Sequence, residues 1–97
     1  MRVYISGGIT GVNDHEKRFS EAEQELLQLG HYVVNPCNIE VPEGVEKSWQ
    51  NYMRADLLVM LTCEALYMLN NWRTSRGALL EHFIAITLGF KIIYQEG

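Results

Sequence analysis

The 97-residue sequence contains no block of lysine and arginine, and its formal net charge is −4. Proteins that bind duplex nucleic acid normally carry a basic face, so this charge balance argues against that class. No apolar run approaches the ~18 residues that a membrane-spanning helix needs, and no segment resembles a signal peptide. We therefore expect a cytoplasmic protein that has no membrane partner.

The spacing typical of metal-binding residues is also missing. Cys37 and Cys63 are isolated, in neither C-x-x-C nor Cys/His spacing, and His15, His31 and His82 are scattered along the chain. This pattern predicts two reduced thiols in or near the core, with no metal site and no cofactor.

Strands and helices alternate along a chain that is 47% hydrophobic and short enough to form a single domain over residues 1–97. The predicted strands are short apolar runs without strict alternation, which favours a parallel sheet covered on both faces by helices. Right-handed crossovers then favour the strand order 2-1-3-4, a small flavodoxin-like three-layer α/β sandwich. The predicted strands span residues 2–6, 31–35, 64–69 and 90–94, and the predicted helices span 14–29, 48–62 and a third segment that ends at Gly89.

A sheet of this order has a switch point beside its first and third strands. Ligands of such sheets bind there, beyond the C-terminal strand ends. The loops at residues 6–11 and 70–77 both open at this edge. We therefore predict a pocket between residues 7–11 and 70–77.

Two acidic residues fall on the apolar faces of separate helices and are the candidate catalytic residues. An unpaired buried polar group costs roughly 2–7 kcal/mol, so such acids are tolerated mainly where they function. Two alternatives remain: Glu81 is a partly exposed helix acid, or Asp56 simply pairs with a nearby arginine, Arg54 or Arg76. The face predicted for Glu81 carries Gly77, Ala78, Ile84, Ala85 and Leu88, and the stripe of Asp56 carries Trp49, Tyr52, Met53, Leu57, Met60 and Leu61.

Small residues and hydroxyls dominate the two loops at the switch point. The run Y-I-S-G-G-I-T-G at residues 4–11 lets the backbone approach a ligand closely, or simply forms a tight turn. It matches neither the dinucleotide-binding G-x-G-x-x-G nor a Walker A motif. In S-x-G-x-x-x-E at residues 75–81, Ser75 either caps the helix or helps to hold a phosphate against free N–H groups.

These motifs together resemble the nucleoside 2-deoxyribosyltransferase superfamily, which includes the deoxynucleoside 5′-monophosphate N-glycosidases. The resemblance rests on Y-x-x-G-x-I-x-G after the first strand, on Asp56 placed eight residues before the acid Glu64, and on S-x-G-x-x-x-E. Over nearly the whole chain, the sequence is also similar to short phage and bacterial members of unassigned activity. They share the patterns Y-M-R-x-D, C-[DE]-A and G-W-x-x-S-x-G-A-x-x-E, which this chain matches almost throughout.

The resemblance implies a role for each matching residue. Glu81 occupies the place of the nucleophile that attacks C1′ of a 2-deoxyribose, and Asp56 that of the acid that protonates the leaving base. Trp72 offers a flat surface for stacking a base, or alternatively covers the sheet edge. The expected substrate-binding residues are Tyr4, Gly7, Gly8, Ile9, Trp72, Ser75 and Gly77.

One position departs from the glycosidase pattern. Thr10 stands where the glycosidases have an arginine, and Arg73 or Arg76 is the candidate replacement as the cation for a phosphate. Two functions therefore remain open: an enzyme that hydrolyses or transfers the N-glycosidic bond of a nucleoside or nucleotide, and a non-catalytic nucleotide-binding protein. Because the Glu81 helix is apolar nearly all round, we also expect a homodimer or higher homo-oligomer.

Overall fold

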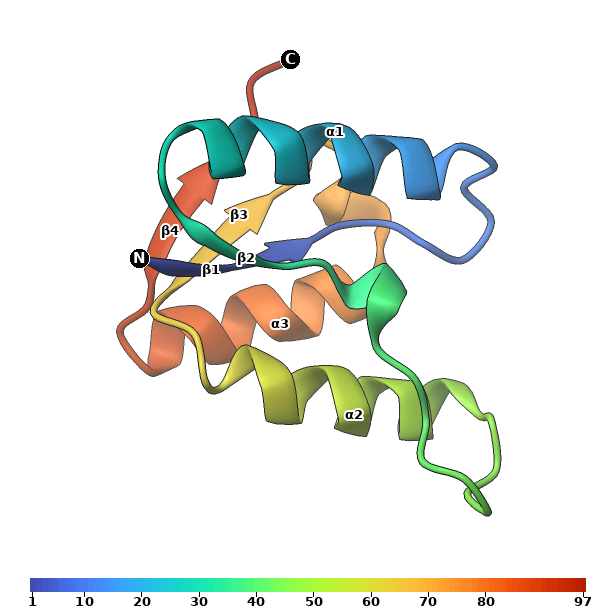
Figure 1. The fold of residues 1–97 in the computed structure, drawn as a ribbon. Coiled ribbons are helices and arrows are strands. Elements are labelled where there is room, and N and C mark those ends of the chain that lie inside the picture. Colours follow the sequence, from blue (N-terminus) through green and yellow to red (C-terminus); the bar gives the residue numbers. More distant parts are fainter.

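Four parallel strands form one sheet in the order β2-β1-β3-β4 in the computed structural model, which describes residues 1–97 (Figure 1). The predicted α/β fold and its strand order are therefore confirmed. The strands are β1 (Arg2–Ser6), β2 (Tyr32–Val34), β3 (Ala65–Met68) and β4 (Lys91–Tyr94), and the helices are α1 (His15–Gln28), α2 (Trp49–Met60) and α3 (Arg76–Thr87).

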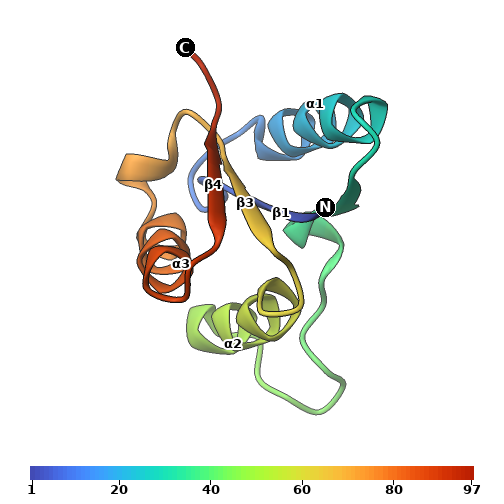
Figure 2. The same cartoon turned by 90° about the vertical axis from the view of Figure 1, so that its left-hand side faces the viewer.

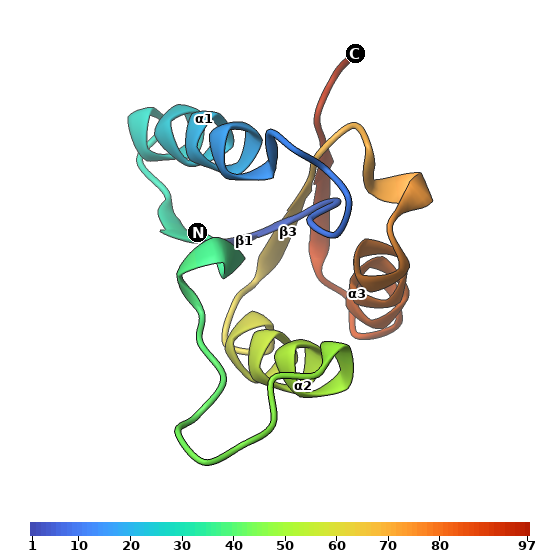
Figure 3. The same ribbon diagram turned by 90° about the vertical axis from the view of Figure 1, so that its right-hand side faces the viewer.

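The helices cover both faces of the sheet. Figures 2 and 3 show α1 on one side and α2 with α3 on the other. Each side has its own apolar core, and each helix contributes to the core that it covers. On the α1 side, for example, Phe19 and Leu26 pack with Val3 and Ile5, whereas Met60 and Ala85 pack with Tyr4 on the opposite side.

Strand β1 determines which side chains face α3. Successive strand residues point to opposite faces, so Val3 and Ile5 face α1 while Tyr4 and Ser6 face the α2–α3 side. All four side chains are fully buried. Two hydroxyl groups are thereby directed from the centre of the sheet towards α3.

The helix ends correct two details of the sequence analysis. Leu61 and Leu88 were expected on the buried stripes of their helices, but 51% and 58% of these residues are exposed. Both are C-cap residues, one position beyond the last helical residue, where the 3.6-residue repeat no longer sets the direction of a side chain. None of the α-helices has the length and apolar composition that crossing a membrane requires.

Candidate active site

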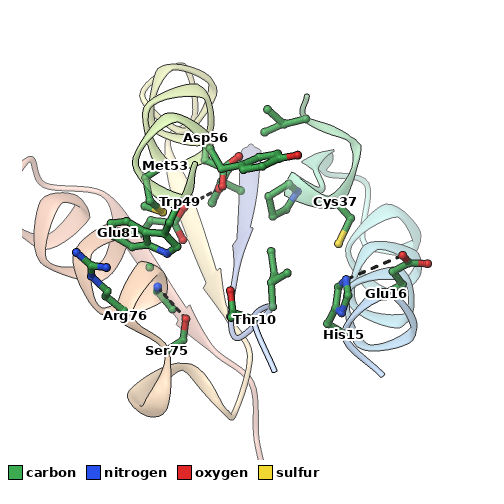
Figure 4. A pocket seen from close by; sticks show the side chains of 18 of the residues that line it. Thr10, His15, Glu16, Cys37, Trp49, Met53, Asp56, Ser75, Arg76 and Glu81 are labelled. Carbon is green, nitrogen blue, oxygen red and sulfur yellow. Dashed lines mark hydrogen bonds and ion pairs between the residues drawn. The ribbon is translucent and has the colours of Figure 1, made fainter. Parts of the chain in front are cut away.

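A cavity of about 830 Å³ opens between the loop after β1, the start of α3 and the inner face of α2 (Figure 4). This volume falls within the roughly 300–1,000 Å³ usual for small-molecule sites. The cavity lies at the predicted switch point. Both candidate acids line it, together with Tyr4, Gly7, Ile9, Thr10, Ser75, Arg76 and Gly77, and Trp49, Tyr52 and Met53 of α2.

Glu81 is held by both hydroxyl groups of β1. The Tyr4 hydroxyl donates a hydrogen bond of 2.6 Å to Oε2, and the Ser6 hydroxyl donates one of 2.7 Å to Oε1. Only 5% of Glu81 is exposed, so the alternative of a partly exposed helix acid is wrong. Two donors fix the orientation of the carboxylate within the cavity wall.

The surroundings of Glu81 act on its ionisation in opposite directions. Burial has the largest effect and raises the pKa of Glu81, the hydrogen bonds from Tyr4 and Ser6 lower it, and the charge of Asp56 raises it, which together give a pKa of about 7. Burial and the neighbouring Glu81 charge raise the pKa of Tyr4, so its phenol stays protonated and remains a donor.

Asp56 is half-buried on α2, and its side chain makes no hydrogen bond or ion pair within the protein. The two arginines considered as partners point elsewhere: Arg54 donates to Asn51 at 3.5 Å, and Arg76 stacks on Trp49. The alternative of a simple ion pair is therefore wrong. Burial alone raises the pKa of Asp56 to about 7.

The two acids differ in which protonation state their surroundings favour. Hydrogen bonds donated to a carboxylate stabilise its charged form, and only Glu81 accepts them. Asp56 has no such donors, and burial disfavours its charged form. Near neutral pH the arrangement therefore favours an ionised Glu81 beside a protonated Asp56, which is the division of roles that a nucleophile and an acid require.

Two glycines permit the close packing around this pair. A Cβ on Gly77 would lie 3.1 Å from the Met53 sulfur, so the Met53 side chain of α2 would have to shift to make room for it. On Gly7, a Cβ would lie 2.7 Å from a side-chain carbon of Leu69. Gly77 thereby lets Met53 of α2 pack directly against the first turn of α3.

Gly8 and Trp72 do not line the cavity. The N–H of Gly8 donates to the Asn71 side chain at 3.0 Å and joins the loops after β1 and β3. Trp72 is buried against His82 and Tyr94, with ring centroids 4.2 and 6.0 Å away. Of its two possible roles, Trp72 therefore covers the sheet edge, because its ring packs against these side chains and not in the cavity.

Trp49 and Ser6 are cavity-related residues that sequence reasoning missed. Trp49 is the first residue of α2, and the guanidinium carbon of Arg76 lies 3.7 Å from the centre of its ring. Arg73 instead stacks on Trp72, outside the cavity. Of the two arginines left open as a phosphate cation, only Arg76 borders the site. Ser6 could have been found from the strand period, because it lies two residues after Tyr4.

The remaining cavity residues offer no metal centre. No group of three or more His, Cys, Asp and Glu side chains is placed to hold a metal ion. Ser75 caps α3 by accepting from the N–H of Ala78 at 3.2 Å, as one of its two predicted roles requires. Its hydroxyl hydrogen remains available to a ligand.

The fold is one that a known glycosyl-transferring enzyme also has. The structure of the 2-deoxyribosyltransferase from the psychrotolerant bacterium Bacillus psychrosaccharolyticus superposes with a TM-score of 0.77 and 22% sequence identity, over 97% of this chain and 71% of that chain. The chain itself belongs to the family described as a domain of unknown function, DUF4406, whose sequence profile matches residues 1–94. No curated protein matches the sequence.

Replacing Glu81 tests how far burial of its charge limits stability. The pKa of Glu81 rises from an ordinary 4.5 to about 7 on folding, so the folded state keeps a proton that the unfolded chain releases between these pH values. The contribution of Glu81 to the free energy of unfolding is therefore fully present below about pH 4.5 and is lost as pH rises through about 7. We expect Glu81→Gln to gain stability relative to wild type between pH 5 and pH 8, by on the order of 3 kcal/mol. Urea denaturation at both pH values measures the difference, and a pH-independent difference would contradict the buried-charge explanation.

Proposed function

We propose that the protein cleaves the N-glycosidic bond of a 2′-deoxynucleotide, with Glu81 as nucleophile and Asp56 as acid. The observation that carries this proposal is the pairing itself: a buried carboxylate oriented by two hydroxyls shares one cavity with an unpaired acid whose pKa is about 7. A protein that only binds a nucleotide has no need of two inward acids beside a polyanion. The fold shared with a 2-deoxyribosyltransferase supports the same chemistry.

The reaction proceeds in two displacement steps. The Glu81 carboxylate forms a bond to C1′ of the deoxyribose as the bond from C1′ to the base nitrogen breaks, and the proton of Asp56 moves to the departing base. The ionised Asp56 then takes a proton from the water that attacks C1′, which releases the sugar and restores the Glu81 carboxylate. If a second base attacks in place of water, the outcome is transfer.

Two basic side chains of the cavity favour a phosphorylated substrate. Arg76 and Lys47 are the lysine and arginine residues that line it, and neither forms an ion pair with the protein. An uncharged nucleoside would gain little from these cations, whereas a 5′-phosphate would pair with them. Arg76 also follows Ser75, which lines the cavity as well and whose hydroxyl hydrogen is a possible donor.

Incubation with a panel of deoxynucleosides and deoxynucleotides tests the proposal, with free base followed by chromatography. We expect base release from deoxynucleoside 5′-monophosphates and slower release from the corresponding nucleosides. Adding a second free base distinguishes transfer from hydrolysis, because only transfer yields a new nucleotide. Tight binding of nucleotides without any release would establish the non-catalytic alternative.

We also propose that the protein forms a homodimer through α3. Phe83 is 68% exposed, and a whole strip of this helix is apolar. Light scattering at micromolar concentration should give a dimer mass, and Phe83→Glu should shift it towards the monomer because a charge cannot be buried there without a partner. A monomeric wild-type protein would refute the proposal. The other exposed apolar residues of α3 are Leu79, Leu80 and Ile86, and Leu88 lies just beyond the helix.

A further inference from the structure

One end of the cavity contains a group of polar side chains that the proposed chemistry does not use. Figure 4 shows His15, Glu16 and Cys37 together on the side away from Arg76 and Glu81. The apolar side chains of Ile9 and Pro36 line the cavity as well. The proposed function places the phosphate at Arg76 and the sugar at Glu81, which leaves this end of the cavity for the base.

The hydrogen bonding of His15 fixes which of its ring nitrogens can accept. Nδ1 lies 2.9 Å from the backbone oxygen of Val12. A carbonyl oxygen only accepts, so Nδ1 carries the hydrogen, and in the neutral imidazole Nε2 is left as an acceptor. The side chain of His15 is 28% exposed, so this acceptor is only partly open to water.

Glu16 provides a second acceptor beside the first. Its Oε1 lies 4.0 Å from Nε2 of His15, so the two atoms form an ion pair when the imidazole is protonated and are two acceptors when it is neutral. One nitrogen atom can stand at the usual hydrogen-bond distance of about 2.9 Å from both of these atoms, provided that it carries two hydrogens. An exocyclic amino group of a base is such a donor, whereas an oxo group at the same position presents only lone pairs.

Cys37 adds no competing negative charge to this end. Partial burial at the cavity wall, followed by the nearby charges of Glu16 and Asp56, raises the pKa of the Cys37 thiol to about 11, so it remains an S–H group. The expectation of two core or near-core thiols is right for the buried Cys63 but wrong for Cys37, which is exposed at the cavity.

We propose that His15 and Glu16 select the base, and that the site prefers bases with an exocyclic amino group over their oxo counterparts. This inference rests on the proposed function for the orientation of the ligand. An amino base satisfies both acceptors, while an oxo base sets its own lone pairs against them and leaves them unpaired. Two nucleotide pairs test this difference: dCMP against dUMP, in which an oxo group replaces the amino group and N3 gains a hydrogen, and dGMP against dIMP, which lacks only the amino group of guanine.

Calorimetric binding to Glu81→Gln measures the preference apart from catalysis. We expect dCMP to bind at least about tenfold more tightly than dUMP, with the same direction for dGMP against dIMP. In Glu81→Gln that also carries His15→Ala and Glu16→Gln, the ratios should fall below about threefold. The matched control is Glu21→Gln, which makes the same charge change on an exposed part of α1 away from this cavity and should leave the ratios unchanged.

Each result separates the two proposals. The base-selecting role is overturned if the affinity ratios are near one in Glu81→Gln, or if they persist after His15→Ala and Glu16→Gln are added. This holds even if wild type releases base. The expected ratios with no release by wild type support the base-selecting role and reject the enzymatic proposal. Failure to bind any of the four nucleotides overturns both. Because Glu16 is exposed, Glu16→Gln alone serves as a second variant that leaves the fold intact, and it should reduce the ratios part of the way.

Discussion

Glu81→Gln is expected to abolish base release, by at least ~10³-fold in kcat, while the variant still folds and binds nucleotide. The amide cannot act as an anionic nucleophile, and it removes the charge that stabilises the cationic transition state. Its oxygen and nitrogen can still form hydrogen bonds with the hydroxyls of Tyr4 and Ser6, so the local structure should remain. Single-turnover release of base and calorimetric nucleotide binding measure the two effects separately.

The control for this experiment is Glu21→Gln, which should release base at the wild-type rate. Activity of Glu81→Gln equal to wild type would rule out the nucleophile and with it most of the argument for catalysis. A non-catalytic protein would behave in the opposite way. Wild type would then release no base, and Glu81→Gln would bind a phosphorylated ligand more tightly because a like charge is gone from the cavity.

The strand order could be predicted because few arrangements satisfy right-handed crossovers between parallel strands. The inward position of Glu81 was likewise predictable, since an acid at a buried helical position stands out against apolar neighbours. Its partners were harder to predict. The hydrogen bonds to Tyr4 and Ser6 join residues that are 77 and 75 positions apart, and such contacts depend on how α3 packs on the sheet.

The two tryptophans show where local sequence is insufficient. Trp72 lies in a loop at the switch point, yet its contacts with His82 and Tyr94 turn it away from the cavity. Trp49 lies on the stripe expected to form core, yet it borders the cavity and stacks against Arg76. Both outcomes depend on side chains supplied by distant elements. Proximity to a strand end therefore identified the region of the site but not which aromatic ring faces it.

Asp56→Asn is expected to slow base release by about 10²–10⁴-fold for ordinary bases, because a positioned acid contributes roughly this factor. An asparagine has no proton to give to the leaving nitrogen. A base that is already cationic, such as N7-methylguanine, departs without protonation, so its release should change far less. The ratio of the two effects distinguishes loss of an acid from simple damage to the site, which would slow both substrates alike.

The pH dependence of the same variant provides a second, independent measurement. In wild type the rate should rise as Glu81 loses its proton and fall as Asp56 loses its own, with both pKa values about 7, so the optimum lies near neutral pH. The alkaline fall requires Asp56, because its ionised form has no proton to donate. Asp56→Asn should therefore lose the alkaline fall and keep the acid limb, which belongs to Glu81. An alkaline fall that persists unchanged in Asp56→Asn would show that another group supplies the proton, and Asp56 would no longer be the acid.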